Sequence, residues 1–257
     1  MSFTTLRETI FNGEERKMKN KLRIGFITLV GLAVILGFGA IFSYSAEIER
    51  GNLIRIVRVD VEPQNETEFN RRYDEEHEPL LQKVLGVIAT FKGKNLGEKG
   101  QKYFFLYVHK NLDVQKSDLY REASATKWAK EVRPFLKNFE GRNYEVIFPG
   151  RLPGGVDKGN IIRTVEVNVA LEQEQDFSDW YNKEHIPTLM KVPGVMSIWR
   201  AVNLGEKGQK FLTVYFQENM TVQQREDYKM ASQTDWIKRL RPFLKDLTGT
   251  NYEVTGR

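Results

Sequence analysis

Hydrophobic residues recur along the chain with two different periods. Leu53–Val61 and Ile161–Val169 alternate β-branched apolar residues with polar ones, which predicts two strands. Glu66–Val84 and Glu174–Val192 carry apolar residues three and four positions apart, which predicts two helices with one apolar face each. The same strand-then-helix pattern therefore occurs twice.

Each predicted helix is followed by the same series of elements. In the second half, a Pro-Gly turn leads into a predicted strand, Val195–Asn203, and a short loop joins it to another strand, Lys210–Gln217. A second helix follows, and one of its faces is formed by Tyr228, Ser232, Trp236, Leu240 and Phe243, matched in the first half by Tyr120, Ser124, Trp128, Val132 and Phe135. The tetrapeptide NYEV then begins a last strand. The order β-α-β-β-α-β is that of the ferredoxin-like split unit.

The two halves align with each other without a gap. Residues 52–149 and 160–257 are identical at 45 of 98 positions, and residues 150–159, rich in Pro and Gly, separate them as a linker. We expect two tandem α+β domains produced by duplication. Each sheet has a bare face, and pairing the two sheets buries both in an intramolecular α/β barrel with pseudo-two-fold symmetry. The chain is then a monomer with an internal pseudo-dimer, or a domain-swapped homodimer.

One predicted surface loop is unchanged between the halves. Asn95–Lys102 and Asn203–Lys210 both read NLGEKGQK, although loops normally diverge sooner than cores. Contact with a partner explains such identity, and so does turn geometry, because Gly205 and Gly208 suit positive φ. The sequence favours turn geometry.

The N-terminal region carries a membrane signal. Residues 24–46 contain no charged side chain, and this run is long enough for a helix to span a bilayer. The basic tail, residues 1–23, ends in a segment rich in Lys and Arg, which holds its end in the cytoplasm. We expect a single-pass anchor with the later domains outside the cytoplasm. The alternative is a signal peptide cleaved near Ser45, which leaves a secreted or periplasmic protein.

Charge and composition exclude several functions. The formal net charge is +5, but beyond residue 50 the chain has 32 Lys and Arg against 29 Asp and Glu, and the two signs alternate. Nucleic acid is not an expected partner, because phosphate binding needs clustered positive charge. The absence of cysteine excludes disulfides, thiol nucleophiles and cysteine metal ligands. No metal and no cofactor is expected from the spacing of the histidines, although a haem held by a single histidine stays open.

Residues 177–195 read FSDWYNKEHIPTLMKVPGV and resemble the first-helix signature of the dimeric α/β-barrel superfamily. They are most similar to small bacterial EthD-like proteins, in which a W-Y-x-x-E-H-I/L-P-x-L run precedes V-P-G-V. Together with the order of elements, the resemblance covers nearly all of residues 52–257. It implies the barrel fold. For activity it implies only a range, which includes cofactor-free monooxygenases, muconolactone-type isomerases, polyketide cyclases and haem-binding enzymes.

The first half departs from this signature at three positions. Arg72, Glu78 and Leu85 stand where the second half has Trp180, Ile186 and Pro193. If only one half is a working site, the resemblance favours the second.

His185 and its counterpart His77 are the candidate catalytic residues. His185 shares the core-facing stripe of Tyr181, where a neutral imidazole suits a general acid or base, with Tyr181 or Glu184 setting its tautomer. The alternative is structural. Pro187 leaves the carbonyl four residues before it without a helical donor, and a buried imidazole N–H nearby supplies one. Both interpretations stay open in the sequence.

An arginine interrupts an otherwise apolar strand face in each half. Arg163 and Arg55 occupy these positions, and a charge there needs a partner. Glu253 and Glu145, in the last predicted strands, are the expected partners. The functional alternative is an arginine that faces a pocket and binds an anionic or carbonyl-bearing ligand.

Two functional hypotheses make different predictions. The first is a cofactor-independent enzyme acting on a small apolar or aromatic compound, with Trp180, Trp236 and Tyr228 at its cleft unless they are core aromatics. It predicts a cavity beside His185 and a shifted histidine pKa. It is excluded if His185 is fully packed and both of its ring nitrogens are bonded to the protein. The second is a non-catalytic module of the cell envelope that binds a ligand or a protein, and it predicts no cavity at either histidine.

Overall fold

The structure is a computed structural model and describes residues 47–256. The expected basic tail and membrane-spanning segment, residues 1–46, lie outside the described residues. None of the helices in residues 47–256 has the length and hydrophobicity of a membrane span.

Both halves of the described chain give the same series of strands. In the first half the strands are β2 (Leu53–Val61), β3 (Val87–Asn95), β4 (Tyr103–His109) and β5 (Leu136–Phe148). In the second half they are β7 (Ile161–Val169), β8 (Val195–Asn203), β9 (Phe211–Gln217) and β10 (Leu244–Gly256). Each set forms an antiparallel sheet, in the orders β3-β4-β2-β5 and β8-β9-β7-β10. The expected β-α-β-β-α-β order is confirmed in both.

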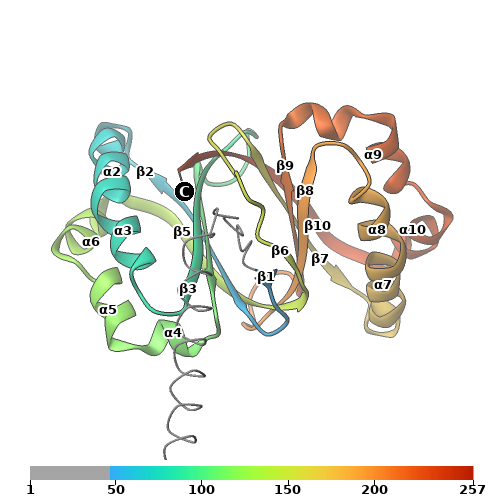
Figure 1. The fold of residues 1–257 in the computed structure, drawn as a ribbon, viewed down its shortest axis with the longest axis horizontal. Helices are drawn as coiled ribbons and strands as arrows, with labels where there is room; N and C mark the ends of the chain where they lie inside the picture. The colour runs from blue at the N-terminus through green and yellow to red at the C-terminus, as the bar shows by residue number, and fades with distance from the viewer. Residues whose placement is uncertain (1–46, 257) are drawn as a thin grey trace, which may run out of the picture. The chain divides into compact units, whose positions relative to one another are not determined.

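Short helices cover the outer surface of the strands. The first half has α2 (Glu66–Arg72), α3 (Glu78–Gln82), α4 (Asp113–Lys116), α5 (Asp118–Ser124) and α6 (Lys127–Val132). The second half has α7 (Glu174–Trp180), α8 (Ile186–Leu189), α9 (Glu226–Ala231) and α10 (Asp235–Leu240). Figure 1 shows the two sets of helices on opposite sides of the strands. The single second helix expected in each half is divided, and in the first half Ser117 and Thr126 cap the starts of α5 and α6.

The two sheets join through their longest strands, β5 and β10. β5 pairs with β2 through residues 136–145 and with β8 of the other half through residues 144–148. β10 pairs in the same way with β7 and then with β3. The eight strands thereby close one antiparallel barrel within a single chain, which confirms the expected α+β barrel. NYEV lies inside each long strand, where it changes partner, so the prediction that it begins the last strand is wrong.

Strands β4 and β9 are buried along their whole length. One face of each contributes to the barrel interior and the other packs against helices, which explains why YFFLYVH and FLTVYFQ lack the alternation of a half-exposed strand. The interior is filled by large buried side chains, among them Phe91, Phe104, Tyr144, Trp199, Phe216 and Tyr252. Burial of this apolar surface is the main stabilisation of the barrel.

The segment that joins the halves is part of the core as well as a linker. Its residues Gly150–Arg151 form β6, which pairs with β1 (Glu47–Ile48). The Arg151 carbonyl accepts hydrogen bonds from Ser197 Oγ at 2.7 Å and from Trp199 Nε1 at 3.0 Å. Three apolar side chains of these segments join the interior cluster: Ile48, Leu152 and Val156.

The long first helix expected in each half is interrupted by a π-helical turn. Tyr73–His77 and Tyr181–His185 adopt this geometry, between α2 and α3 and between α7 and α8. In the second half Pro187 follows two residues later and removes an N–H donor that a continuous α-helix uses. The candidate tyrosine and histidine are the first and last residues of each turn. Such turns occur frequently at functional sites.

The unchanged hairpin loops are held by their own side chains. Asn203 Nδ2 donates to the carbonyls of Lys207 and Gln209 at 2.8 and 3.1 Å, and Asn95 makes the equivalent contacts in the first half. Gly208 has a φ of +87°, a conformation that side chains disfavour. Gly205 lacks the positive φ expected of it, so that expectation is wrong. Turn geometry, the explanation that the sequence favours, accounts for Asn203 and Gly208.

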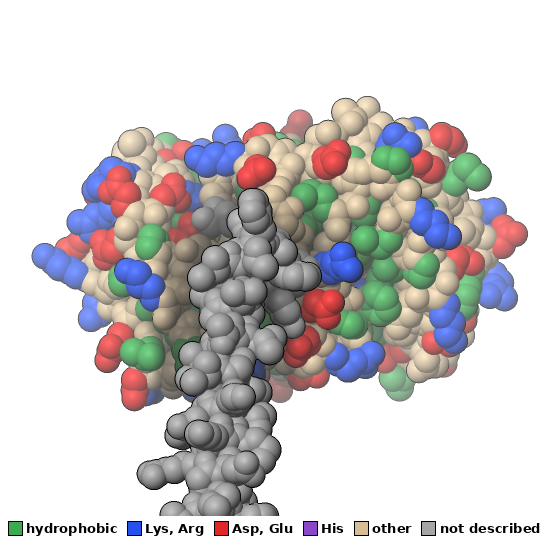
Figure 2. All heavy atoms as spheres, viewed as in Figure 1, with side chains coloured by type: hydrophobic (Ala, Val, Ile, Leu, Met, Phe, Trp, Pro, Cys, Tyr) green, Lys and Arg blue, Asp and Glu red, His purple; other side chains and the backbone are tan. Residues whose placement is uncertain are grey.

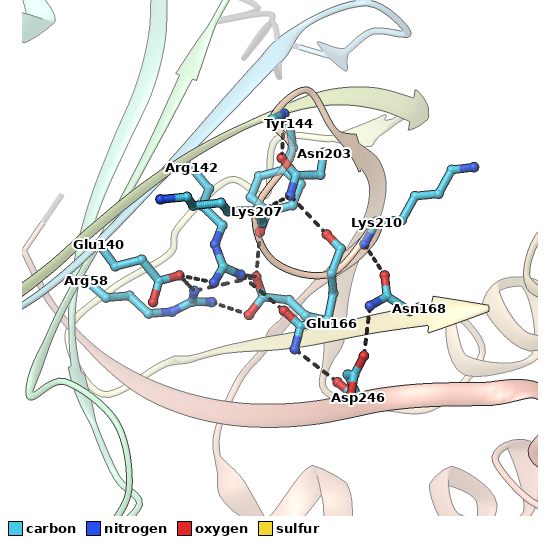
Figure 3. Close-up of polar contacts among 12 residues, drawn as sticks. Arg58, Glu140, Arg142, Tyr144, Glu166, Asn168, Asn203, Lys207, Lys210 and Asp246 are labelled. Carbon is cyan, nitrogen blue, oxygen red and sulfur yellow. Dashed lines mark hydrogen bonds and ion pairs between the residues drawn. The ribbon is translucent and has the colours of Figure 1, made fainter. Parts of the chain in front are cut away.

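A charged network links the two halves within the barrel (Figure 3). Arg58 on β2 and Glu166 on β7 occupy equivalent positions of the two halves, yet their charges are opposite. They form a buried ion pair, with 2.8 Å between Arg58 Nη2 and Glu166 Oε2. Tyr144 Oη donates to Glu166 at 2.5 Å, and Arg58 Nε donates to Tyr252 Oη at 2.9 Å. Burial alone lowers the pKa of Arg58, but the charge of Glu166 and the bond to Tyr252 raise it.

Candidate functional site

Each half encloses a cavity between its sheet and its helices. The first cavity, in the first half, has a volume of about 630 Å³, and the second cavity, in the second half, about 560 Å³. The polar side chains that line the first cavity are Arg55, Tyr73, His77, Tyr107, Gln115, Tyr120, Ser124 and Arg133. Their counterparts line the second: Arg163, Tyr181, His185, Tyr215, Gln223, Tyr228, Ser232 and Arg241. The cavity predicted beside His185 is present, and the prediction of no cavity at either histidine is wrong.

The described residues that line these cavities include basic side chains but no acidic ones. Arg55 and Arg133 contribute to the first cavity, and Arg163, Lys229 and Arg241 to the second. Apolar side chains form much of the second cavity's wall: Val165, Val167, Phe177, Trp180, Ile237, Leu244 and Leu247. On the face drawn in Figure 2, in contrast, acidic and basic side chains are interspersed. Each cavity therefore combines an apolar wall with a local excess of positive charge.

Arg163 has no carboxylate partner within residues 47–256. Its Nη1 donates to Asn251 Oδ1 at 3.1 Å and to Gln223 Oε1 at 3.3 Å. The expectation that Glu253 neutralises it is wrong. The register of β7 and β10 places Asn251 directly opposite Arg163, and Glu253, two residues further along, is exposed.

Arg55 repeats this arrangement in the first cavity. Its Nη1 donates at 3.1 Å to Asn143 Oδ1, which lies directly opposite on β5, so the expected pairing with Glu145 is also wrong. In both halves only Nη1 of the arginine is hydrogen bonded within residues 47–256. The other N–H groups of each guanidinium have no hydrogen-bond partner among the described residues.

A chain of hydrogen bonds runs from His185 to Tyr181 in the second half. The Ala231 carbonyl only accepts, so Nδ1 of His185 carries the proton in their 3.0 Å bond. Nε2 then accepts from Tyr215 Oη at 3.3 Å, and Tyr215 Oη accepts from Tyr181 Oη at 3.2 Å. Tyr181 is the end of this chain and keeps its oxygen lone pairs for a ligand.

Neither ring nitrogen of His185 is free to exchange a proton with a ligand, because both are bonded to protein atoms. In this geometry Nε2 of His185 is connected to the cavity through Tyr215 and Tyr181, and the ring offers no unbonded nitrogen to a ligand. Glu184 does not set the tautomer, since the ring nitrogens are bonded elsewhere and Glu184 Oε1 is buried without a partner among the described residues. The structural alternative is correct in that a carbonyl accepts the ring N–H. That carbonyl belongs to Ala231, however, and not to the residue four positions before Pro187.

The imidazole of His185 is neutral at physiological pH. Burial lowers its pKa, the bond to Ala231 opposes this shift and the nearby charge of Arg200 adds to it, and the resulting pKa is about 4. Burial also raises the pKa of Tyr215 well above its usual value, so that group stays a phenol. The predicted pKa shift at His185 is therefore present, in the direction that disfavours a protonated ring.

His77 has a different environment in the first half. It lines the first cavity, yet neither of its ring nitrogens is hydrogen bonded within residues 47–256, and burial lowers its pKa to about 4. Tyr73 and Tyr107 contact each other as their counterparts do, with 3.0 Å between the two Oη atoms. The first half therefore has a cavity even though Arg72 replaces the tryptophan of the second half. Arg72 pairs with Glu68 and does not line the cavity.

Two of the three aromatic residues expected at the second cavity line it. Trp180 and Tyr228 do so, and Trp180 stacks on His185 with 4.5 Å between ring centroids. Trp236 does not, because its Nε1 donates to Asp176 on α7 at 2.9 Å. Its counterpart Trp128 does line the first cavity.

The hydrophobic pattern of the sequence does not identify Tyr107 and Tyr215 as cavity residues. Each lies in a strand that is buried throughout, so periodicity does not separate it from core aromatics. Comparison of the two halves does separate it, because this tyrosine is the only residue that β4 and β9 share at equivalent positions. Identity between the two halves is therefore the sequence feature that could have identified these two tyrosines.

The cavity walls are more alike in the two halves than the rest of the chain. Fewer than half of all aligned positions are identical, whereas only four of the residues that line the first cavity differ from their second-half counterparts: Phe105, Ala129, Val132 and Phe139. Burial alone does not explain this. Among the first-half strand residues of the interior cluster, only three match: Ile54, Tyr144 and Val146. The identity is concentrated at the cavities.

A third cavity, of about 760 Å³, adjoins the network of Figure 3. Its charged lining includes Arg58 and Arg142, and both are paired. Arg142 Nη2 lies 2.8 Å from Glu140 Oε1, and Arg58 Nη2 lies 2.8 Å from Glu166 Oε2. These paired arginines differ from Arg163 and Arg55, which have amide partners only.

The described residues form no cluster of three or more acidic or histidine side chains that could hold a metal ion. A haem held by one histidine needs a ring nitrogen without a protein partner. His185 does not fit this requirement, because both nitrogens are engaged. Within residues 47–256, only His77 has an unbonded ring at a cavity, and its Nδ1 is buried.

Comparisons with solved structures support the barrel. A provisionally assigned monooxygenase of Fusobacterium nucleatum aligns with a TM-score of 0.62 and 11% identity, over 80% of this chain and 94% of that one. An anthrone oxidase-like protein gives 0.56 and 11% identity, over 82% and 94%. A mutant chlorite dismutase of Candidatus Nitrospira defluvii, in complex with cyanide, gives 0.55 and 12% identity, over 80% and 92%. No protein-family model and no curated protein matches the chain.

These likenesses define a class of fold, the ferredoxin-like α+β barrel of the dimeric type. At identities of 11 to 12% they show the fold alone. The function has to be argued from the cavities.

Proposed function

We propose that each half of the protein binds a small apolar or aromatic molecule that carries one anionic oxygen group, such as a carboxylate or phenolate. The observation that carries this proposal is the arginine at each cavity wall. Arg163 and Arg55 are partly buried, have amide oxygens as their only partners within residues 47–256, and lie beside apolar surface. A ligand anion supplies the charge partner that the protein does not.

Tyr228 adds a hydroxyl to the polar end of the second cavity. Gln223 holds Arg163 by accepting from it, while its own amide N–H groups donate to Gln217 and Asn251. Burial raises the pKa of Tyr228, so it stays a phenol that can donate to an anion. The apolar walls stabilise the rest of the ligand by about 25 cal/mol for each Å² of apolar surface that binding removes from water.

Cofactor-independent acid–base catalysis is the second candidate function, and the Tyr181–Tyr215–His185 chain favours it. In this proposal Tyr181 accepts a proton from the substrate while its own proton passes to Tyr215 and that of Tyr215 passes to Nε2 of His185. His185 is then a positioning residue that acts through the tyrosines. Its low pKa disfavours the protonated end state, which is why binding ranks ahead of catalysis.

The identity between the halves supports a finer proposal about origin. An EthD-like ancestor duplicated in tandem accounts for the internal repeat and for the retained cavity linings. A monomer whose two halves form one internal pseudo-dimer follows from this proposal, with a domain-swapped homodimer as the alternative. Light scattering distinguishes them by mass.

The sequence of residues 24–46 supports a proposal about location. This uncharged run behind a basic segment favours a single-pass anchor, with the barrel outside the cytoplasm. Membrane fractionation tests it. Release of the barrel into the soluble fraction, with a new N-terminus near Ser45, supports cleavage instead.

Calorimetric titration of the full chain in detergent tests the binding proposal. The probes are naphthoate and its neutral isostere, naphthamide. We expect two naphthoate molecules per chain, and Arg163→Gln and Arg55→Gln each to remove one tight site, because a charged hydrogen bond contributes about 1.5–3 kcal/mol. Arg225→Gln is the control, since Arg225 is exposed and paired with Asp227. Equal naphthoate binding by all four proteins contradicts the proposal.

A further inference from the structure

A buried positive charge lies behind the aromatic wall of the second cavity. Arg200, on β8, is 1% exposed. Its Nη1 donates to Asn182 Oδ1 at 2.8 Å, and its Nη2 has no hydrogen-bond partner within residues 47–256. It has no ion pair with a carboxylate in that range either. Burial lowers its pKa to about 10, so the guanidinium is still charged at neutral pH.

This charge contacts the rings that form the cavity wall. The guanidinium carbon of Arg200 lies 4.5 Å from the ring centroid of Tyr181 and 5.4 Å from that of Phe177. Both rings line the second cavity, whereas Arg200 itself does not. A charge held at this depth is weakly screened by solvent, so its field reaches a ligand on the other side of the rings.

The equivalent charge in the first half is neutralised. Lys92 occupies the position that corresponds to Arg200, and it lies 5.1 Å from the ring centroid of Tyr73. Its Nζ is paired with Asp74 Oδ1 at 2.8 Å. The residue that corresponds to Asp74 in the second half is Asn182, so one change of Asp to Asn accounts for the unneutralised charge behind the second cavity.

We propose that Arg200 makes the second cavity selective for anionic ligands over their neutral analogues, and that the first cavity, behind which Asp74 neutralises Lys92, discriminates less. This inference rests on the proposed function, because it specifies the charge of the ligand that one of the two cavities takes. The two cavities then share a shape and a set of polar residues but differ in charge preference. Both cavities can therefore hold an anionic compound, and the first also accepts a neutral relative of it.

Asn182→Asp tests this inference with a conservative change, because it supplies the carboxylate that the first half already has. Asn182→Asp is introduced into a parent protein, the full chain carrying Arg55→Gln. Because Arg55→Gln removes the tight site of the first cavity, tight naphthoate binding then measures the second cavity alone. We expect the affinity for naphthoate to fall about tenfold and that for naphthamide to stay within roughly twofold, the order expected for one added charge about 10 Å away. The control is Gln175→Glu, which adds a carboxylate to the exposed side of α7, the helix that leads into the turn containing Asn182.

The outcomes separate the two claims. If the parent binds naphthoate and Asn182→Asp leaves its affinity unchanged, the inference is overturned and the proposed function stands. An equal loss in Gln175→Glu also overturns it, because the effect is then a general one of surface charge. If the parent and the wild-type protein fail to bind naphthoate at all, the proposed function itself fails.

Discussion

Glu166→Gln removes the carboxylate at the centre of the charged network while keeping the volume of the side chain. Glu166 accepts from Arg58 at 2.8 Å and from Tyr144 at 2.5 Å, and Arg142 Nη1 lies 3.3 Å away. The substitution leaves Arg58, which is 6% exposed, with Glu140 as its nearest carboxylate, at 3.3 Å. An incompletely compensated charge therefore remains inside the barrel.

The magnitude follows from this burial. Breaking a buried ion pair from one side costs about 3–5 kcal/mol, and we expect the lower end because Glu140 is retained. For a folded unit of this size, a loss of about 3 kcal/mol corresponds to a decrease in Tm of about 10 °C. Removal of an exposed pair costs less than about 1 kcal/mol. Glu174→Gln, which breaks the exposed contact with Lys210, is the matched control.

Circular dichroism during thermal and urea unfolding measures both variants. Arg58→Met in the Glu166→Gln background then tests coupling: it should cost less than Arg58→Met alone, because the charge that lacks a partner has gone. If Glu166→Gln and Glu174→Gln destabilise the protein equally, the network does not hold the halves together as argued.

Two further predictions concern acid stability and the linker. Burial, together with the nearby charge of Arg55, lowers the folded-state pKa of His109 from 6.5 to about 4. The folded protein therefore binds fewer protons than the unfolded chain in that interval, and its stability falls as the pH drops from 6.5 to 4. His109→Gln installs the residue found at the equivalent position, Gln217. Urea unfolding at pH 7 and pH 4 should show that the variant loses about 3 kcal/mol less free energy of unfolding than the wild type. An equal loss in both proteins contradicts the role given to His109. Gly150→Ala should destabilise strongly in the same assay, since its Cβ meets Trp199 Cδ1 at 2.6 Å, whereas Gly154→Ala meets nothing within 4 Å. Equal stability of the two alanine variants refutes the role of the linker in the core.

The strands were predictable where their two faces differ in environment. Leu53–Val61 and Ile161–Val169 were bounded correctly because every second residue packs against the helices. The start of each long strand was missed because Leu136–Gly141 is mostly exposed and polar, so its composition resembles a loop. Its pairing with β2 is visible only in three dimensions.

The site was predictable only in part. The odd arginine on an apolar face identified Arg163, but its partner depended on strand register, which places Asn251 and not Glu253 opposite it. The histidine was identified from its helical stripe. Its bond to Ala231 joins segments that are distant in the sequence, and no local pattern contains that contact. Arg200 was missed for the same reason, since its environment depends on α7 packing over β8.

The central claim is that Arg163 and Arg55 anchor an organic anion in two equivalent cavities. A crystal structure of the full chain with bromonaphthoate tests it most directly, because the bromine locates the ligand without ambiguity. The account predicts one ligand in each cavity, with a carboxylate oxygen about 3 Å from a guanidinium nitrogen of Arg163 or Arg55. A ligand bound only in the third cavity beside Arg58, or with its carboxylate turned away from both arginines, contradicts it.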